Sequence, residues 1–231
     1  MESPASMHEG ITVAGKAPPE PDELGRAIAR GFDAIELYLE RSHLEDVNAT
    51  IGLLEAVAVE VVSVHTPHVP IDEPEWLRRS DRLADALGAY LVVHSNRIVH
   101  TFTPDLEALD FRSEYGYEHN PGISERHVRS TILDRGHEFV LDTAHLYMAE
   151  RDYRSVTEGL LREFGDQLRV VHLCDSSLRN DGLGFGDGSM DMRTLSELLG
   201  RYFEGTLVLE VMPDRQREAR ERLQSYWSAA E

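Results

Sequence analysis

Eight short apolar segments alternate with amphipathic segments along the 231 residues of this chain, and this alternation restricts the fold more than any other feature. Short apolar runs between polar residues are typical of buried parallel strands, and intervening helices provide the crossovers that parallel pairing requires. The strand candidates are residues 11–14, 32–37, 61–65, 90–94, 109–118, 139–142, 168–173 and 206–210. The sequence therefore predicts the α/β class, with residues 1–231 forming a single (β/α)8 TIM barrel domain.

Helical spacing fills most of the intervals between these strands. The expected helices cover residues 22–31, 44–59, 73–87, 124–136, 153–164, 192–203 and 214–227. Between residues 95 and 110 Pro104 interrupts the pattern, so we expect a short or irregular helix there. An open doubly wound sheet is the alternative architecture. However, no Gly-x-Gly-x-x-Gly motif follows the first strand, so the dinucleotide-binding fingerprint is missing.

The chain carries a net charge of -19, from 42 acidic and 23 basic residues. Tight binding to nucleic acid or to an anionic membrane would need a basic stripe to offset this charge. The densest basic segment, residues 215–222, is interleaved with Glu218 and Glu221 and is typical of a solvated helix face. Lys16 is the only lysine, and such an acidic, lysine-poor composition is expected in a salt-rich cytoplasm. The charge therefore favours a small-molecule partner over nucleic acid or a membrane.

Cysteine usage and the first residues bear on the compartment. Cys174 is the only cysteine, so an internal disulfide is impossible and a reducing compartment is expected. Strand alternation points Cys174 away from the barrel mouth, as a buried structural thiol. Residues 1–10 contain Glu2 and Glu9 and lack the apolar core of a signal peptide. No apolar run approaches the roughly 18 residues of a membrane span. We therefore expect a cytoplasmic protein.

Ionisable side chains stand where the predicted strands end. These exits carry Glu36, His65, His94, Glu118, Asp142 with His145, His172 with Asp175, and Glu210. In a parallel barrel the carboxyl ends of all strands surround one mouth, so these groups are expected to converge. Burying several carboxylates without a cation would cost stability. Because imidazole and carboxylate ligands together suit Mn²⁺, Zn²⁺, Co²⁺ or Mg²⁺, the sequence predicts a divalent metal site in the mouth.

Individual polar residues also have simpler interpretations. His119 and Asn120 are expected to shape the turn before Pro121, and Glu36 alone fits a salt bridge inside the mouth. His65 alone is equally well explained as a core histidine bonded to the backbone. Four other histidines fall in expected loops or helices and are interpreted as solvated: His68, His100, His127 and His137. The metal hypothesis therefore depends on the joint pattern of the strand exits.

Several short motifs give the chain a resemblance to a known superfamily. Residues 142–145 read Asp-Thr-Ala-His, residues 172–176 read His-Leu-Cys-Asp-Ser, residues 186–188 read Gly-Asp-Gly, and Leu-Val-Leu-Glu ends at Glu210. Tyr-Glu-His-Asn at residues 117–120 resembles the glutamate-bearing exit of the fifth strand. With these motifs the chain resembles the xylose isomerase-like barrels of the sugar isomerase/epimerase and AP endonuclease family 2 superfamily. Enzymes of different chemistry share the motifs, so the resemblance does not specify a substrate.

The resemblance implies roles for the residues that match. In the ketose epimerases the corresponding residues bind a single metal ion, which here implies the ligand set Glu118, Asp142, His172 and Glu210. Glu118 and Glu210 would also be the catalytic acid/base pair that removes and returns a proton beside the substrate carbonyl. His145 and Arg179 would contact the substrate. Glu36 is also a candidate for substrate binding, from its position at the same mouth. The implied chemistry is proton transfer at an acidified carbon.

The endonuclease branch implies further metal sites. His65 and His94 match histidines that hold a second ion in that branch, together with the shared Glu118. The same branch places an Asp-x-His motif after strand seven for a third ion, whereas residues 179–184 contain no histidine here. The resemblance therefore implies one or two ions and an incomplete three-metal site.

We therefore expect a metal-dependent isomerase or epimerase that acts on a sugar, sugar phosphate or polyol. The alternative is a metal-dependent, AP endonuclease-like phosphodiesterase of DNA repair, which His65 and His94 favour and the net charge opposes. A barrel that binds a metal or ligand without turnover is a third interpretation. Related barrels often associate, so a homo-oligomer agrees with the resemblance, although no interface is identified by these residues.

Overall fold

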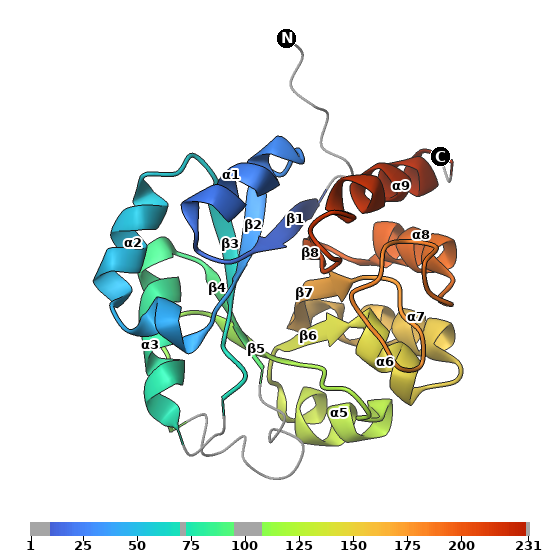
Figure 1. The fold of residues 1–231 in the computed structure, drawn as a ribbon. Helices are drawn as coiled ribbons and strands as arrows, with labels where there is room; N and C mark the ends of the chain where they lie inside the picture. Colours follow the sequence, from blue (N-terminus) through green and yellow to red (C-terminus); the bar gives the residue numbers. More distant parts are fainter. Residues whose placement is uncertain (1–9, 70–72, 95–107, 230–231) are drawn as a thin grey trace.

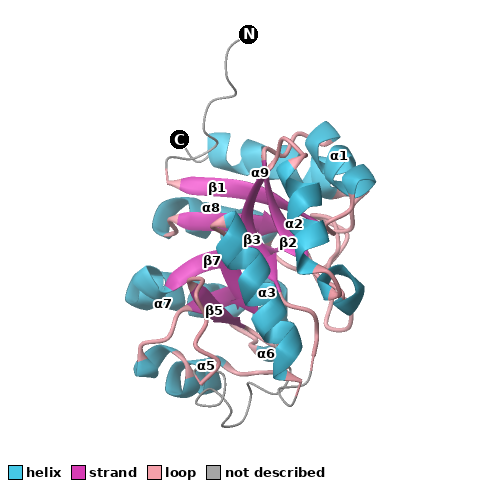
Figure 2. Cartoon of the chain, turned by 90° about the vertical axis from the view of Figure 1, so that its left-hand side faces the viewer, coloured by secondary structure: helices cyan, strands magenta, loops and turns pink. Residues whose placement is uncertain are grey.

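The strands close into the barrel that the sequence predicts. The computed structural model describes residues 10–69, 73–94 and 108–229. Every strand pairs in parallel with its neighbours in the sequence, and β8 returns to β1. Figures 1 and 2 show the strands at the centre and the helices around them. The strands are β1 (Ile11–Ala17), β2 (Ala34–Tyr38), β3 (Glu60–His65), β4 (Tyr90–Val93), β5 (Tyr115–Glu118), β6 (Phe139–Asp142), β7 (Leu168–Leu173) and β8 (Gly205–Leu209). The predicted α/β class and TIM barrel are confirmed.

The helices pack against the outer surface of the barrel. They are α1 (Pro21–Ala29), α2 (Val47–Glu55), α3 (Pro74–Leu87), α5 (Glu125–Thr131), α6 (Thr143–Ala149), α7 (Tyr153–Phe164), α8 (Met192–Tyr202) and α9 (Gln216–Ser228). Short 3₁₀ segments are η1 (Arg41–Leu44), η2 (Leu133–Arg135) and η3 (Gly165–Gln167). No helix in the described part of the chain combines the length and apolar character that a membrane span needs.

Two expected helices differ from those in the structure. The helix expected over 44–59 is shortened to α2, because Asp46 caps α2 by accepting a hydrogen bond from the Ala49 backbone N–H at 3.1 Å, and Leu44 instead ends η1. The helix expected over 124–136 forms α5 and then η2. Most of the irregular helix expected between 95 and 110 lies outside the described residues, and residues 108 and 109 form a turn.

The fifth strand begins later than the predicted residue 109. The carboxylate of Asp81 on α3 accepts hydrogen bonds from the backbone N–H groups of Arg112 and Ser113, each at 3.0 Å. Asp110 has a φ of 51°, in the left-handed region. These contacts hold the preceding loop against α3, so regular pairing begins only at Tyr115.

Helix α6 was not expected from the sequence. It begins at Thr143, directly after β6, and the Asp142 side chain caps it by accepting a hydrogen bond from the His145 backbone N–H at 2.8 Å. The helix has only 7 residues, too few to show clear apolar periodicity. This cap places the side chains of Asp142 and His145 together at the mouth.

Strand alternation fills the barrel interior in layers. One apolar layer consists of the buried residues Ala14, Ala34, Val92, Val140, Val170 and Val208. Because successive side chains point to opposite faces of a strand, the residue two positions further on points into the same interior. Those next residues are Lys16, Glu36, His94, Asp142, His172 and Glu210. The apolar layer therefore closes the barrel beneath a polar layer at the carboxyl ends of the strands, where barrels of this kind carry their active sites.

Candidate metal centre and active site

Four side chains at the mouth converge on one point, which we call the carboxylate site. The possible ligand atoms of Glu118, Asp142, His172 and Glu210 all lie within 4.8 Å of one another. Nδ1 of His172 is 2.8 Å from Oε1 of Glu118 and 2.8 Å from Oε2 of Glu210. The resemblance implied these four residues as metal ligands, and the structure brings them together. One nitrogen and three carboxylates form a donor set that suits a divalent ion.

The imidazole of His172 is completely buried between acidic groups. Burial alone would lower its pKa, but the charges of Glu36 and Glu210 outweigh burial and raise the pKa well above the ordinary value. The proton on Nδ1 therefore stands between two carboxylates, where a metal ion would bind. A histidine must lose this proton to bind a metal, so the arrangement suits the exchange of a proton for a cation.

Glu36 lies behind His172 instead of facing the open mouth. Its carboxylate is 3.1 Å from Nε2 of His172, is completely buried, and accepts a hydrogen bond from Ser63 Oγ at 2.8 Å. Burial raises its pKa, but His172 and Lys16 outweigh burial and lower the pKa to about 2. A carboxylate on the far nitrogen of a metal-binding histidine fixes the ring orientation and raises ligand basicity. Glu36 lines neither cavity of the mouth, so the geometry favours support of His172 over the substrate contact expected from the sequence.

Three histidines form a second cluster, which we call the histidine site. One ring nitrogen from each of His65, His68 and His94 lies within 4.8 Å of the other two. The rings of His68 and His94 are 3.9 Å apart between centroids. Burial lowers the pKa of His94 to about 3, which keeps this ring in the neutral form that binds metals. His68 is exposed, but it faces this cluster and not only solvent as the sequence suggested.

Glu118 lies between the two clusters. Its Oε1 contacts His172, as described above, while its Oε2 is 2.9 Å from Nε2 of His65 and 3.8 Å from Nε2 of His94. The Nδ1 atom of His94 is buried and has no hydrogen-bond partner in the described structure. One carboxylate thus turns an oxygen toward each cluster, which is the geometry of a bridging ligand.

His145 belongs to a separate hydrogen-bonded group at the edge of the mouth. Its Nδ1 donates to the His119 carbonyl oxygen at 2.6 Å, and its Nε2 is 3.3 Å from Oδ2 of Asp181. Burial lowers its pKa, but the neighbouring charges of Asp142 and Asp181 prevail and raise the pKa to about 10. Both N–H groups of this imidazolium already face acceptors, so His145 lies outside the two clusters, and a substrate oxygen would take the place of Asp181 as its partner.

The raised pKa of His145 predicts that the metal-free protein becomes less stable as the pH increases from about 7 to about 9. The folded state keeps the proton up to about pH 10, whereas the unfolded state loses it near the ordinary value of 6.5. The contribution of His145 is therefore fully present below 6.5 and is lost as the pH rises toward 10. The free energy of unfolding should fall by up to about 1.4 kcal/mol per pH unit for this group.

Urea unfolding of metal-free protein at several pH values would measure this effect. The variant His145→Gln removes the titrating group and should show a shallower decline over the same range. Equal slopes in the two proteins would contradict the assignment of the proton to His145.

Two cavities open at the mouth and share residues of both clusters. One has a volume of about 390 Å³, and its lining includes His65, His94, Glu118, Asp142, His145 and Glu210. The other has about 470 Å³, and its lining includes Lys16, Tyr38, His68 and Glu210. These volumes suit a small-molecule ligand. A larger depression of about 680 Å³ is bordered by α7 and α8, away from both clusters.

Some residues singled out in the sequence lie elsewhere. Arg179 is exposed in the loop after β7 and lines neither cavity. Asp175 is buried and accepts hydrogen bonds from the backbone N–H groups of Gly186 and Gly188, so it holds the glycine-rich loop. Cys174 is buried as expected, but it borders the 390 Å³ cavity and does not point away from the mouth.

Two residues that the sequence analysis did not propose also belong to the mouth. Lys16 was missed because the first strand was expected to end at Ala14, whereas β1 continues to Ala17. The period of two from Ala14 would have placed Lys16 inside the barrel. Asp181 was missed because its contact with His145 depends on how the loop folds back over the barrel, which no short motif encodes.

No protein-family model matches the sequence. Among curated proteins, an uncharacterized protein of Mycobacterium leprae and one of Mycobacterium tuberculosis are each 29% identical, over 83% of this chain and 84% of the relative. The similarity therefore extends over most of both chains.

Solved structures identify the class of barrel. A xylose isomerase domain protein from Planctomyces limnophilus has a TM-score of 0.71 at 14% identity, covering 95% of this chain and 97% of its own. A D-allulose 3-epimerase from Methylomonas sp. in complex with D-allulose gives 0.67 at 16%, covering 94% and 97%. An AP endonuclease of family 2 from Brucella melitensis gives 0.66 at 14%, covering 93% and 98%. The chain therefore has the xylose isomerase-like TIM barrel fold, and the resemblance inferred from the strand-exit motifs is confirmed for the fold.

Proposed function

We propose that this protein is a divalent-metal-dependent isomerase or epimerase that acts on a sugar, sugar phosphate or polyol. The observation that carries the proposal is the convergence of Glu118, Asp142, His172 and Glu210 beside a cavity of about 390 Å³. A solved epimerase of the same fold holds D-allulose, which supports a sugar-like ligand. The negative charge gathered at the carboxylate site supports a resident Mn²⁺, Zn²⁺, Co²⁺ or Mg²⁺ ion.

The proposed mechanism assigns proton transfer to two glutamates. The metal, when bound, would polarise the substrate carbonyl and make the neighbouring C–H group more acidic. Glu210 borders both cavities and would take the proton from that carbon. Glu118 would return a proton to the opposite face in an epimerase, and His145 would donate a hydrogen bond to a substrate oxygen. Glu36 would keep the His172 ring oriented throughout.

A screen in deuterated water would test this function. Metal-loaded protein would be incubated separately with keto-sugars, sugar phosphates, inositol derivatives and an abasic-site DNA duplex. We expect deuterium incorporation beside the carbonyl of one sugar or polyol class. Cleavage of the duplex without any exchange on the small molecules would replace the proposed function with the phosphodiesterase alternative.

The phosphodiesterase alternative depends on the histidine site. His65 and His94 meet Glu118 in the arrangement that the endonuclease branch implies for a second ion. Against it, Asp181 pairs with His145, and position 183 is a leucine where that branch requires a histidine. The net charge of -19 also opposes DNA binding. We therefore retain the isomerase or epimerase as the proposed function, with binding without turnover as the outcome of a negative screen.

The histidine site gives a prediction about metal content. The double variant His65→Ala, His94→Ala should lose one bound ion per chain and keep the ion of the carboxylate site, because only Glu118 serves both clusters. Metal analysis after dialysis against Zn²⁺ or Mn²⁺ would measure this change. His43→Ala removes a histidine outside the mouth and serves as the control. Unchanged metal content in the double variant would leave His65 and His94 with a substrate-binding or structural role.

A further inference from the structure

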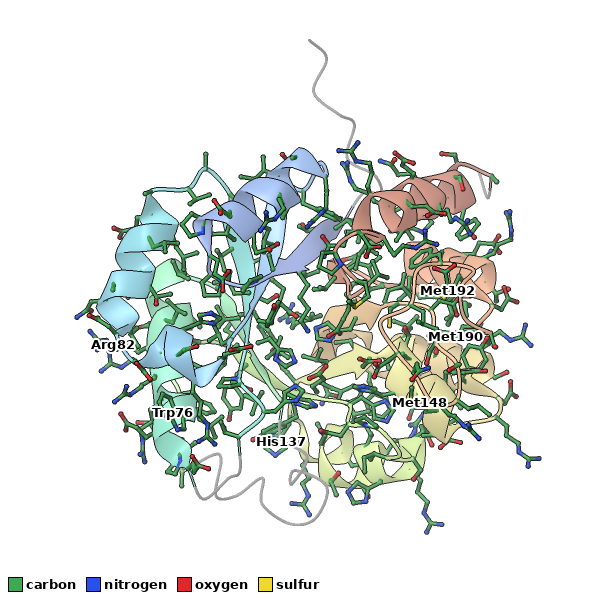
Figure 3. The ribbon with its side chains drawn as sticks, viewed as in Figure 1. Trp76, Arg82, His137, Met148, Met190 and Met192 are labelled. Carbon is green, nitrogen blue, oxygen red and sulfur yellow. The ribbon has the colours of Figure 1, made fainter. Side chains whose placement is uncertain are left out.

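Lys16 is the only lysine of the chain. Apart from histidines, its other basic side chains are all arginines. Arg82 on α3 is one such arginine: Figure 3 shows it at the outer edge of the molecule, where its guanidinium donates to Asn48 at 2.6 Å. Lys16 lies instead in the polar layer of the barrel, with a side chain only 12% exposed. Among the described residues, no arginine borders either mouth cavity. Lys16 therefore places an ammonium group at the mouth, and no other side chain of the sequence carries one.

The ammonium group of Lys16 joins two carboxylates that have different tasks. Its Nζ is 2.5 Å from Oε1 of Glu210 and 3.2 Å from Oε1 of Glu36. Glu210 is the proposed base, and Glu36 orients the metal-binding His172. Lys16 therefore links the proposed base, Glu210, to Glu36, the carboxylate that orients His172.

The backbone of Lys16 is also fixed in place. Lys16 pairs in register with Glu36 of β2. Its carbonyl oxygen accepts a hydrogen bond from Nε2 of the buried Gln216 at 2.9 Å. The side chain of Lys16 thus begins from a fixed point of the barrel.

One donor of the ammonium remains for a ligand. An ammonium carries three N–H donors, and two of them face Glu210 and Glu36. Within the described ranges, the contacts of Nζ are with these two carboxylates, and Lys16 lines the cavity of about 470 Å³ together with Glu210 and His68. A guanidinium would bind carboxylates through a rigid planar fork, whereas a compact ammonium can divide its donors between two carboxylates and a third group. This property explains a lysine at the position.

We propose that Lys16 holds Glu210 in place and donates its remaining N–H to the substrate oxygen that becomes negatively charged when Glu210 removes the neighbouring proton. This role rests on the proposed function. The proton passes from carbon to Glu210, and the electron pair of the C–H bond forms a carbon–carbon double bond while the carbonyl oxygen takes the negative charge. Lys16 forms and breaks no covalent bond. A fixed donor aimed at developing charge acts mainly on the transition state, so its loss should lower turnover more than substrate affinity.

Variants of Lys16 test this role, because kcat and KM can be measured separately in each of them. Lys16→Met should lower kcat by about 100-fold and change KM by less than about threefold, with metal content retained. Lys16→Arg keeps the charge but should recover no more than about a tenth of the activity, because its planar fork cannot replace the ammonium. Arg215→Met is the matched control, since Arg215 also pairs with two carboxylates, Asp187 and Glu218, outside the mouth. Full activity in Lys16→Met or in Lys16→Arg would overturn the proposal.

A spectroscopic experiment on the unaltered protein does not require knowledge of the substrate. Protein produced in cells supplied with isotope-labelled lysine contains a single labelled side chain, so the NMR signals of the label report on Lys16 alone. A two-carbon hydroxamate, which imitates the charged intermediate of such proton transfers, would be added to the Zn²⁺-loaded protein. We expect a saturable shift of the Lys16 signal. Binding by calorimetry with an unchanged Lys16 signal would overturn the role of Lys16 only, whereas absence of binding would count against the proposed function and remove Lys16's role with it.

Discussion

Glu210→Gln should lower proton exchange at the substrate carbon by about 1000-fold or more while the chain keeps its fold. Glu210 borders both cavities of the mouth, and its carboxylate is the proposed base. Glutamine has almost the same shape, but its amide cannot accept that proton. Deuterium incorporation into the substrate, measured by mass spectrometry, would give the rate. Circular dichroism and metal analysis would show whether fold and metal content persist.

The substitution also replaces a proposed metal ligand, so the rate must be measured with the metal site filled. Excess metal during the assay separates a loss of the base from a loss of the ion. Glu221→Gln provides a control of the same chemistry on the exposed surface of α9. Unchanged exchange in Glu210→Gln would remove this residue from the acid/base role and leave Glu118 as the remaining candidate.

Glu118→Ala should weaken metal binding at both proposed sites, each by about 100-fold or more. The physical reason is its position: Oε1 is 2.8 Å from Nδ1 of His172, and Oε2 is 2.9 Å from Nε2 of His65. Removal of this side chain takes a charged ligand from both clusters at once and leaves two imidazoles facing a void. Competition with a chromogenic chelator would measure the affinity of each site.

Two comparisons sharpen the Glu118 experiment. The double variant of His65 and His94 should lose only the histidine site, so the two proteins together show whether Glu118 is shared. Glu114→Ala, one residue before β5 and exposed, removes a glutamate from the same segment without touching either cluster. Loss of a single ion in Glu118→Ala would contradict the bridging geometry.

The prediction of the fold succeeded where local pattern and tertiary environment agree. The apolar runs of β6 and β7 are buried on both faces of the sheet, so they read as continuous apolar segments. The prediction failed where side chains from distant segments decide the conformation. Asp81 on α3 holds the loop that was assigned to the fifth strand. Helix α6 was missed for a different reason, because its 7 residues are too few to show apolar periodicity.

The candidate site shows the same division. Asp142, His172 and Glu210 stand at strand ends and were found because barrel geometry brings all strand ends together. The contact of Glu36 with His172 could not be predicted from strand ends, because the two residues are 136 positions apart in the sequence. His68 could not be placed either, since it follows β3 in a loop whose path the sequence pattern does not fix.

The sequence by itself determined the alternation of strands and helices, and with it the closed barrel and the set of ionisable groups around its mouth. It did so because the periodicity of apolar residues is a local property, which can be read from each short segment without knowledge of the tertiary structure. The tertiary structure alone decided which groups face one another: His172 against Glu36, Glu118 between two clusters, and Lys16 against Glu210. These pairings depend on the stagger of strands around the barrel and on side-chain packing, and both are set only when all eight strands have closed.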